Sequence, residues 1–442
     1  MDWLRASAAE QGRAIMAGLI SPLEQTEAYL DAALRHPYGE RIYARMTPER
    51  ARKESVAAHD RARTGRRRGL LDGVALSWKD NFDTAGVATE AGSRLLEGRI
   101  PTEDARVLAN ATGEGLICLG KTHLTELAFS GLGLNPMTAT PPNAYDAALA
   151  PGGSSSGAAV SVALGLAAAA IGSDTGGSIR LPAAWNGLVG FKPTHGAISG
   201  QGIVPLCLRF DTAGPIARTV EDCALLFSAL TQTAAVDLSE TPNRKLRVLV
   251  LEGLPFDEAR EAPVAAFEDA IHRLGKAGAQ ITRATLPVVT EIMQNAATAF
   301  APEAYGIWRD QIEAAPELMY PPILARFRGG KDVLATDYVA AWIKIDELRA
   351  AYAEAVAGYD VVALPTSPIL PPDVALLLAD PEYFARENLL ALRNTRIGNF
   401  LGLPAISLPT GHPGCGLMLM GHARRDRALL VSAAGAEAAL AV

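Results

Sequence analysis

The sequence has no long continuous apolar stretch. The Ala- and Gly-rich run at residues 156–173 is shorter than the ~20 apolar residues that usually cross a bilayer, and it favours a buried helix that leads into a strand. Residues 1–21 lack the basic start and the continuous apolar core of a secretory signal. We therefore expect a cytoplasmic protein with no membrane partner.

Cysteine is scarce. The four cysteines lie far apart, with no CxxC pair and no histidine at metal-ligand spacing: Cys118, Cys207, Cys223 and Cys415. This excludes a disulfide framework and predicts reduced, buried thiols. The HExxH motif, the P-loop and a GxGxxG after a strand are also absent. We expect no metal, nucleotide or organic cofactor.

Positive charge is not in excess either. A formal net charge of -7 argues against a broad face for binding nucleic acid. The one basic cluster, at residues 61–68, follows a polar helical stretch, and we interpret it as a solvated linker. The charged fraction of 20% and the hydrophobic fraction of 49% are those of a globular chain rather than a disordered one.

The predicted fold class is α/β. Short apolar segments alternate with helical stretches from residue 74 to the end of the chain, which is typical of a sheet covered by helices. No long linker or fixed-period repeat interrupts them. We predict a single large α/β/α domain with a mixed central sheet and helices on both faces. Helices at 21–36 and 48–63 would form an N-terminal helical layer, residues 1–68, before a core of residues 69–442.

A lysine follows an apolar strand in the segment GVALSWKDN, residues 73–81. Half burial at the strand end would lower the pKa of Lys79, because burial disfavours the charged form. The amine could then act as a base near neutral pH. Taken alone, the same residue could simply pair with Asp80 at the strand end.

Two glycine- and serine-rich segments come next. In PGGSSSG, residues 151–157, paired glycines allow hydroxyls and amides to approach another group closely, although such a loop is most often only a turn before a helix. In GSDTGGSIRLPAA, residues 172–184, Ser178 follows two glycines, and successive amides could converge on a developing oxyanion. We interpret Asp174 and Arg180 there as a buried structural pair.

These three segments, in this order, resemble the amidase signature family, and the likeness runs from about residue 20 to the C-terminus. The resemblance implies that Lys79 deprotonates Ser154, a serine held by an unusual cis peptide, and that Ser154 takes the proton from the nucleophile Ser178. It also implies an oxyanion hole made by the amides of Thr175, Gly176, Gly177 and Ser178, with Ser155 and Gly153 in support. The expected activity is hydrolysis of a small or medium carboxamide, or a urea-like amide, through an acyl-enzyme.

The resemblance is closer to free-standing amidases than to the glutaminase (A) subunit of a tRNA-dependent glutamyl/aspartyl amidotransferase, which is the alternative within the family. An alternative of another class is an α/β-hydrolase esterase centred on Ser155, because residues 153–157 satisfy GxSxG. That motif requires an apolar strand just before it, and the residues before it read as loop. His195 is interpreted as a pocket-wall or core residue, and His123 as structural.

Substrate contacts follow only from the resemblance. Five segments are candidates for the wall of the substrate tunnel: 131–137, 301–308, 320–328, 365–370 and 390–399. The candidate substrate-binding residues in or near them are Gly131, Leu132, Tyr305, Arg326, Thr366 and Asn394. Arg326, Arg393 and Arg396 could recognise a carboxylate or a ureido group. We expect a small-molecule amide as partner, no nucleic acid, and a homodimer.

Overall fold

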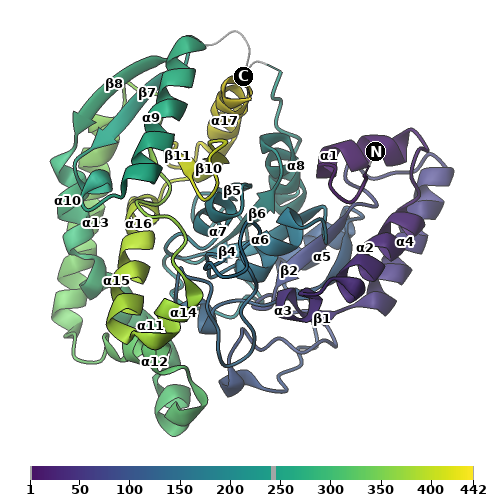
Figure 1. Ribbon diagram of the computed structural model, residues 1–442, viewed down its shortest axis with the longest axis horizontal. Coiled ribbons are helices and arrows are strands. Elements are labelled where there is room, and N and C mark those ends of the chain that lie inside the picture. The colour runs from purple at the N-terminus through teal and green to yellow at the C-terminus, as the bar shows by residue number, and fades with distance from the viewer. Residues whose placement is uncertain (1, 240–244, 442) are drawn as a thin grey trace.

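A mixed sheet of eleven strands runs through the whole molecule (Figure 1), whose computed structural model describes residues 2–239 and 245–441. The strand order is β1-β3-β2-β4-β6-β5-β10-β11-β9-β7-β8. In chain order the strands are β1 (Tyr43–Met46), β2 (Ala75–Lys79), β3 (Ile117–Thr122), β4 (Ala169–Asp174), β5 (Val189–Lys192), β6 (Thr212–Ala217), β7 (Arg247–Glu252), β8 (Gln280–Thr285), β9 (Val361–Pro365), β10 (Ala405–Pro409) and β11 (Gly416–Met420). The predicted α/β fold with a mixed sheet is confirmed.

The strands that precede the three glycine, serine and lysine segments lie next to each other. β2 pairs in parallel with β3 on one side and with β4 on the other. Parallel neighbours end at the same edge of a sheet. Lys79 at the end of β2 and Asp174 at the end of β4 are therefore brought to one edge, where a binding site is expected in a sheet of this kind.

Side chains of the sheet alternate between two apolar layers. Val248 and Val250 of β7 belong to one buried cluster, whereas Leu249 and Leu251 belong to the other. Residues 361–364 of β9 and 417–420 of β11 alternate in the same way. This period of two is what a strand buried on both faces requires.

Helices cover both faces. The first layer contains α1 (Ala8–Met16), α2 (Pro22–Arg35), α4 (Pro48–Arg63), α5 (Arg106–Gly113), α8 (Val220–Thr231), α9 (Glu261–Lys276) and α17 (Asp426–Leu440). The second contains α6 (Ser156–Ala163), α7 (Arg180–Trp185), α10 (Pro287–Gln294), α11 (Ala296–Ala314), α12 (Pro321–Arg328), α13 (Ala335–Ala355), α14 (Val374–Ala379), α15 (Pro381–Ala391) and α16 (Arg393–Phe400). Short pieces complete the set: α3 (Gly39–Ile42), η1 (Arg94–Leu96), η2 (Glu126–Ala128), η4 (Leu254–Phe256) and η5 (Pro316–Leu318).

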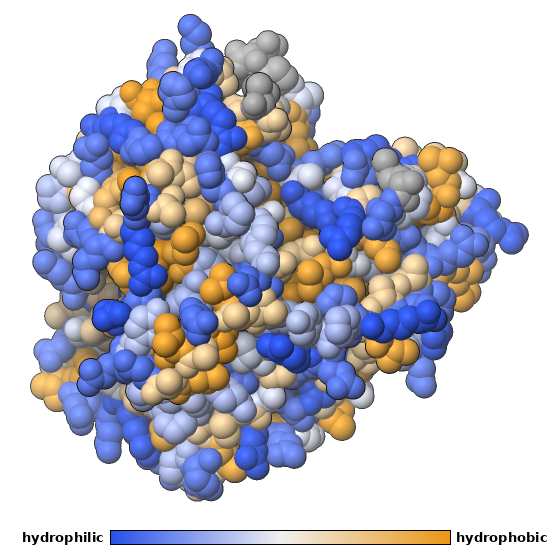
Figure 2. Space-filling view, in the orientation of Figure 1, coloured by the Kyte–Doolittle hydropathy of each residue, from blue (hydrophilic) through white to orange (hydrophobic). Residues whose placement is uncertain are grey.

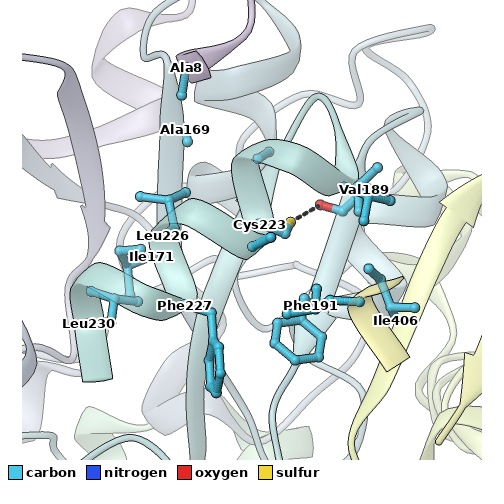
Figure 3. Packing of buried hydrophobic residues seen from close by; sticks show 14 of the residues in the cluster. Ala8, Ala169, Ile171, Val189, Phe191, Cys223, Leu226, Phe227, Leu230 and Ile406 are labelled. Atoms are coloured by element: carbon cyan, nitrogen blue, oxygen red, sulfur yellow. Dashed lines mark hydrogen bonds between the residues drawn. The ribbon is translucent and has the colours of Figure 1, made fainter. Parts of the chain in front are cut away.

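Figure 3 shows how the first layer meets the sheet. Leu226, Phe227 and Leu230 of α8 lie against strand residues such as Ile171 of β4, and Phe227 meets Phe191 of β5 edge to face at 5.6 Å between ring centroids. Burial of such side chains contributes about 1.5–3 kcal/mol each before the entropy cost is counted. This packing holds the centre of the sheet in place, and with it the loops that follow its strands.

The N-terminal segment is not purely helical. It holds α1 to α4, but β1 lies within it and pairs antiparallel with β3, so one of its strands belongs to the main sheet. The boundary at residue 68 stays a prediction. The interpretation of the basic cluster as a solvated linker is only partly right: Arg63, Arg66 and Arg68 are exposed, but Arg61 forms an ion pair with Asp72 at 2.6 Å and Arg67 donates to three backbone carbonyl groups.

Polar side chains dominate the face seen in Figure 2, with apolar side chains in small separate patches between them. Among residues 2–239 and 245–441, no helix combines the length and apolar character needed to cross a bilayer. All four cysteines are buried and free of disulfide bonds, as predicted.

Candidate active site

Lys79 ends β2 with its side chain fully buried. Its Nζ lies within hydrogen-bonding distance of three oxygens: Ser154 Oγ at 2.7 Å, Ser173 Oγ at 2.8 Å and the Ser173 carbonyl oxygen at 3.3 Å. Asn81 donates from Nδ2 to the same Ser173 hydroxyl at 3.0 Å. The amine is thus held one hydrogen bond from Ser154, as the sequence predicted.

No carboxylate forms an ion pair with Lys79 in the described part of the chain. Burial lowers the pKa of Lys79 to about 7, and the charges of Asp174 and Asp211 oppose this shift only in part. At neutral pH a large fraction of the amine is therefore uncharged and has a free lone pair. The pairing with Asp80 that the sequence left open is wrong, because Asp80 binds Lys121 at 2.9 Å and Arg45 at 3.2 Å instead.

Ser154 lies in the loop before α6, and the Gly153–Ser154 peptide bond is cis, as the resemblance implied. The loop is fixed by its neighbours: the Gly153 amide donates to the Gly131 carbonyl oxygen at 2.7 Å, and Ser155 Oγ donates to the Ser173 carbonyl oxygen at 3.1 Å. The Ser155 amide also donates to the Ser178 carbonyl oxygen at 3.3 Å. These bonds hold the two serine-bearing loops together.

Ser178 lies between the end of β4 and the start of α7. Gly177 before it has φ +137°, and a Cβ there would lie 2.1 Å from Thr395 Oγ1, so only glycine fits. The Gly177 amide donates to Asp174 Oδ1 at 2.8 Å. Gly177 is therefore not a free oxyanion donor, contrary to the prediction, because its N–H shapes the loop instead.

The amides of Thr175, Gly176 and Ser178 remain as candidate donors. Within residues 2–239 and 245–441 they donate no hydrogen bond to the protein, and all three residues line the same cavity. Thr175 Oγ1 donates to Asp211 Oδ1 at 2.6 Å, which holds the loop from the side. Burial raises the pKa of Asp211 to about 6, although this bond and two backbone amides oppose the shift.

Asp174 and Arg180 form the predicted buried pair. Arg180 Nη2 lies 3.0 Å from Asp174 Oδ1 and Nε lies 3.0 Å from Oδ2, and both side chains are fully buried. Burial alone would raise the pKa of Asp174, but the Arg180 guanidinium outweighs it and the pKa falls to about 2. Arg180 also donates to Thr395 O and Asn399 Oδ1, so the pair ties the nucleophile loop to α16.

A cavity of about 350 Å³ opens over Ser178. Its wall is mostly apolar, and its residues are Ala128, Phe129, Ser130, Thr175, Gly176, Ser178, Leu206, Met293, Gln294, Ala296, Ala297, Phe300, Ala301, Arg326, Leu389, Leu392, Arg396 and Phe400. Lys79 and Ser154 are not in this wall. Lys79 is therefore screened from the cavity, whereas Ser178 faces it.

Of the six candidate substrate-binding residues, only Arg326 lines this cavity. The structure places the other five elsewhere. Leu132 lies in the second apolar layer, and the Gly131 amide donates to Asn388. The Tyr305 hydroxyl donates to Glu313, the Asn394 side-chain amide donates to the carbonyl oxygens of Pro255 and Pro365, and the Thr366 hydroxyl is hydrogen-bonded to Ser407. Substrate contact by these five is not supported, because their side chains or polar groups are already occupied. Segments 301–308, 320–328 and 390–399 each supply wall residues, but 131–137 and 365–370 do not.

The esterase alternative fails on geometry. Residues 143–153 contain no strand ahead of the GxSxG sequence, and the Ser155 hydroxyl donates to a backbone carbonyl group. His195 was expected in the core or the pocket wall, but it is exposed and bonded to the Leu208 carbonyl oxygen at 2.8 Å. Burial lowers the pKa of His123 to about 4, consistent with a structural role.

The sequence did not reveal the contribution of Ser173 and Asn81 or most of the cavity wall. Ser173 and Asn81 belong to the quoted motifs, so their polar side chains beside Lys79 were the available signal. The wall helices α10 and α11 carry no such signal. Among the described residues, no group of three or more His, Cys, Asp or Glu side chains is placed to hold a metal ion.

Proteins similar to this chain match it over nearly its whole length. A family model described as Amidase matches residues 24–430. The chain belongs to the amidase signature family. A 2-amino-5-chloromuconic acid deaminase of Comamonas testosteroni is 34% identical, with 93% of this chain and 92% of the relative aligned. The A subunit of the glutamyl-tRNA(Gln) amidotransferase of Alkaliphilus metalliredigens is 31% identical over 90% of this chain and 89% of its own.

The crystal structure of an amidase superposes with a TM-score of 0.87 at 30% identity, covering 98% of this chain and 99% of the other. The protein is therefore a hydrolase of carbon–nitrogen bonds other than peptide bonds. The likeness extends over nearly the full length of each relative.

Proposed function

We propose that this protein is a free-standing amidase that cleaves the C–N bond of a small or medium carboxamide through an acyl-enzyme on Ser178. The products are a carboxylate and ammonia or an amine. The observation that carries the proposal is the 2.7 Å bond between buried Lys79 Nζ and Ser154 Oγ, next to a loop that presents Ser178 to a cavity. A serine hydroxyl needs such a base, since it is a poor nucleophile at neutral pH.

In the proposed first step, Ser178 Oγ attacks the amide carbon while its proton passes to Ser154 and the Ser154 proton passes to neutral Lys79. The negative charge on the carbonyl oxygen is stabilised by the amides of Thr175, Gly176 and Ser178. Each well-placed donor of this kind contributes about 3–4 kcal/mol. The proton then returns along the same route to the leaving nitrogen, the C–N bond breaks, and water later hydrolyses the ester.

Ser173 and Asn81 act as positioning residues in this scheme. The Ser173 hydroxyl accepts hydrogen bonds from Lys79 at 2.8 Å and from Asn81 at 3.0 Å. With two N–H bonds directed at Ser173, the nitrogen lone pair of neutral Lys79 is free to face Ser154. The proposed roles of Ser155 and Gly153 are similar, because their bonds hold the loop that carries Ser154.

Trapping of the acyl-enzyme tests the proposal. An activated amide or ester is mixed with the enzyme, the reaction is quenched in acid, and the digested protein is read by mass spectrometry. A mass increase equal to the acyl group is expected on the peptide that contains Ser178. Modification of a different serine, Ser155 included, would contradict the mechanism.

A glutaminase component of an amidotransferase is the second candidate function, because the relative from Alkaliphilus metalliredigens is 31% identical to this chain. The two candidates differ in substrate and in partners. Ammonia release from glutamine, with copurification of partner chains, would favour the amidotransferase component. Turnover of simple carboxamides by the isolated chain would favour the free-standing enzyme. The homodimer and the cytoplasmic location stay predictions, and light scattering of the purified chain tests the former.

A further inference from the structure

Two arginines line the cavity that contains Ser178. Arg326 comes from α12 and Arg396 from α16, so the fold brings them to one cavity from distant parts of the chain. The described residues that line this cavity include no Asp or Glu. The cavity therefore carries positive charge on a mostly apolar wall.

Neither arginine is neutralised by a carboxylate within residues 2–239 and 245–441. Arg326 Nε donates to the Phe129 carbonyl oxygen at 2.7 Å, and Arg396 Nη2 donates to the Leu389 carbonyl oxygen at 2.9 Å. A guanidinium has five N–H groups, so each keeps further donors for another partner. Burial and the charge of Arg396 lower the pKa of Arg326 to about 9, which still leaves it charged at neutral pH. Burial and the charge of Arg393 lower that of Arg396 to about 10.

Other arginines of this protein have the carboxylate partner that Arg326 and Arg396 lack within residues 2–239 and 245–441. Arg180 is fully buried and binds Asp174, and Arg349, which stacks on Trp342 as Arg326 stacks on Phe129, binds Asp346 at 3.0 Å. Two neighbouring, half-buried cations without a counter-charge carry a desolvation cost. An anionic ligand in the cavity would offset that cost.

We propose that Arg326 and Arg396 bind a carboxylate of the substrate, and that the preferred substrates are monoamides of dicarboxylic acids. The proposal rests on the amidase function proposed above. A planar carboxylate matches the guanidinium fork and forms strong charge-assisted hydrogen bonds. Phe129, Phe300 and Leu392 line the same cavity and suit a short hydrocarbon chain between the amide and the carboxylate. Arg393, the third candidate, is not in the wall; it donates to the Pro255 carbonyl oxygen.

Matched pairs of amides test this inference. The value of kcat/KM is measured by ammonia release for succinamate, glutaramate and adipamate, and for the neutral amides of equal chain length. We expect at least one carboxylated amide to exceed its neutral partner by about tenfold or more, because a hydrogen bond to a charged group contributes about 1.5–3 kcal/mol.

Arg326→Gln and Arg396→Gln should each lower this ratio by about 10- to 100-fold, mainly through KM. Arg326→Lys, which keeps the charge, should recover part of it. Arg349→Gln is the matched control, since Arg349 also donates from Nε to a backbone carbonyl oxygen and lies over an aromatic ring, but outside the cavity wall. The control should leave the ratio unchanged.

A ratio near one in the unmodified enzyme, or an unchanged ratio in both Gln variants, would overturn the inference while leaving the amidase function intact. Failure of every amide, with no acyl group on Ser178, would instead overturn the proposed function. Should the Gln variants not fold, binding is measured by calorimetry on Ser178→Ala. Saturable binding of glutaramate, stronger than that of the neutral amide pentanamide, is expected, and equal or absent binding would overturn the inference.

Discussion

The proposed reacting groups and most of the cavity wall come from two different regions of the chain. Lys79, Ser154 and Ser178 lie within residues 79–178, on or beside adjacent strands, and their polar neighbours are tightly hydrogen-bonded. Most of the wall comes from residues 293–400, on helices α10 to α12, α15 and α16, and it is largely apolar. Under the proposed mechanism, the first region determines what reaction occurs, and the second determines which amide reaches it. The difference explains why short motifs identified the reaction but not the substrate.

The largest effect is expected from Ser178→Ala. Removal of the nucleophile should lower kcat by about 10⁴-fold or more, because the remaining residues cannot form the acyl-enzyme. Ammonia release from the best substrate measures it, and circular dichroism checks that the fold is kept. Activity within tenfold of the unmodified enzyme would refute the assignment of the reaction to the first region.

Lys79→Met should lower kcat/KM by about 10²- to 10⁴-fold, since it removes the general base. In the unmodified enzyme, kcat/KM should fall tenfold per unit as pH drops below about 7, where Lys79 becomes protonated. That limb should vanish in the variant. The matched control is Lys192→Met: burial lowers the pKa of Lys192 to about 7 too, but its Nζ donates to the Pro193 carbonyl oxygen. Loss of the acid limb of the pH profile in the Lys192 variant would show that this limb reports the titration of Lys192 rather than that of Lys79.

The same shift couples pH to stability. Between pH about 7 and 10.5 the lysine is protonated in the unfolded chain but not in the folded one, so the free energy of unfolding should rise with pH in that window. The rise should be smaller in Lys79→Met. Urea unfolding at several pH values measures it, and an equal rise in both proteins would contradict the buried, neutral amine.

Arg180→Met tests the hydrogen bonds that connect the two regions, because Arg180 binds both Asp174 of β4 and Thr395 of α16. The substitution leaves the Asp174 carboxylate buried without its cation, which typically costs about 3–5 kcal/mol. Urea unfolding should show that loss. The exposed pair of Arg52 and Glu27 is the control, and Arg52→Gln should leave the free energy of unfolding nearly unchanged.

Phe300→Leu should have the smallest effect on the reaction. Phe300 lines the cavity, so the smaller side chain should shift kcat/KM toward longer acyl chains by about tenfold, as expected for small changes of pocket volume. Phe227→Leu, on α8 in the opposite layer, is the control and should leave the chain-length preference unchanged. A shift of equal size in both variants would show that the preference is not set by the wall.

The fold and the contact between Lys79 and Ser154 could be predicted because their signals are local. The predicted helix 48–63 matches α4, and the apolar runs at 169–173 and 360–365 became β4 and β9. β6 was missed, since Gly214 and Pro215 give its sequence TAGPIA a poor strand propensity; its partners on both sides nevertheless hold it in the sheet.

The cavity wall could not be predicted, because a wall residue and a buried residue have the same composition. On α16, Asn394 and Arg396 are both candidates from the sequence, but they are two positions apart, about 200° around a helix, and only Arg396 lines the cavity. Sequence spacing alone does not fix which face meets the cavity. Tyr305 was chosen on α11, whereas the wall uses Ala297, Phe300 and Ala301 of that helix.

The seclusion of Lys79 makes its charge state directly observable. The whole chain contains eight lysines, so selective labelling of lysine side chains with ¹³C and ¹⁵N gives a spectrum with few signals. A water-shielded, uncharged Nζ exchanges and resonates differently from the ammonium groups at the surface. A titration of that one signal, with and without an inhibitor in the cavity, would follow the catalytic proton itself rather than its effect on rate.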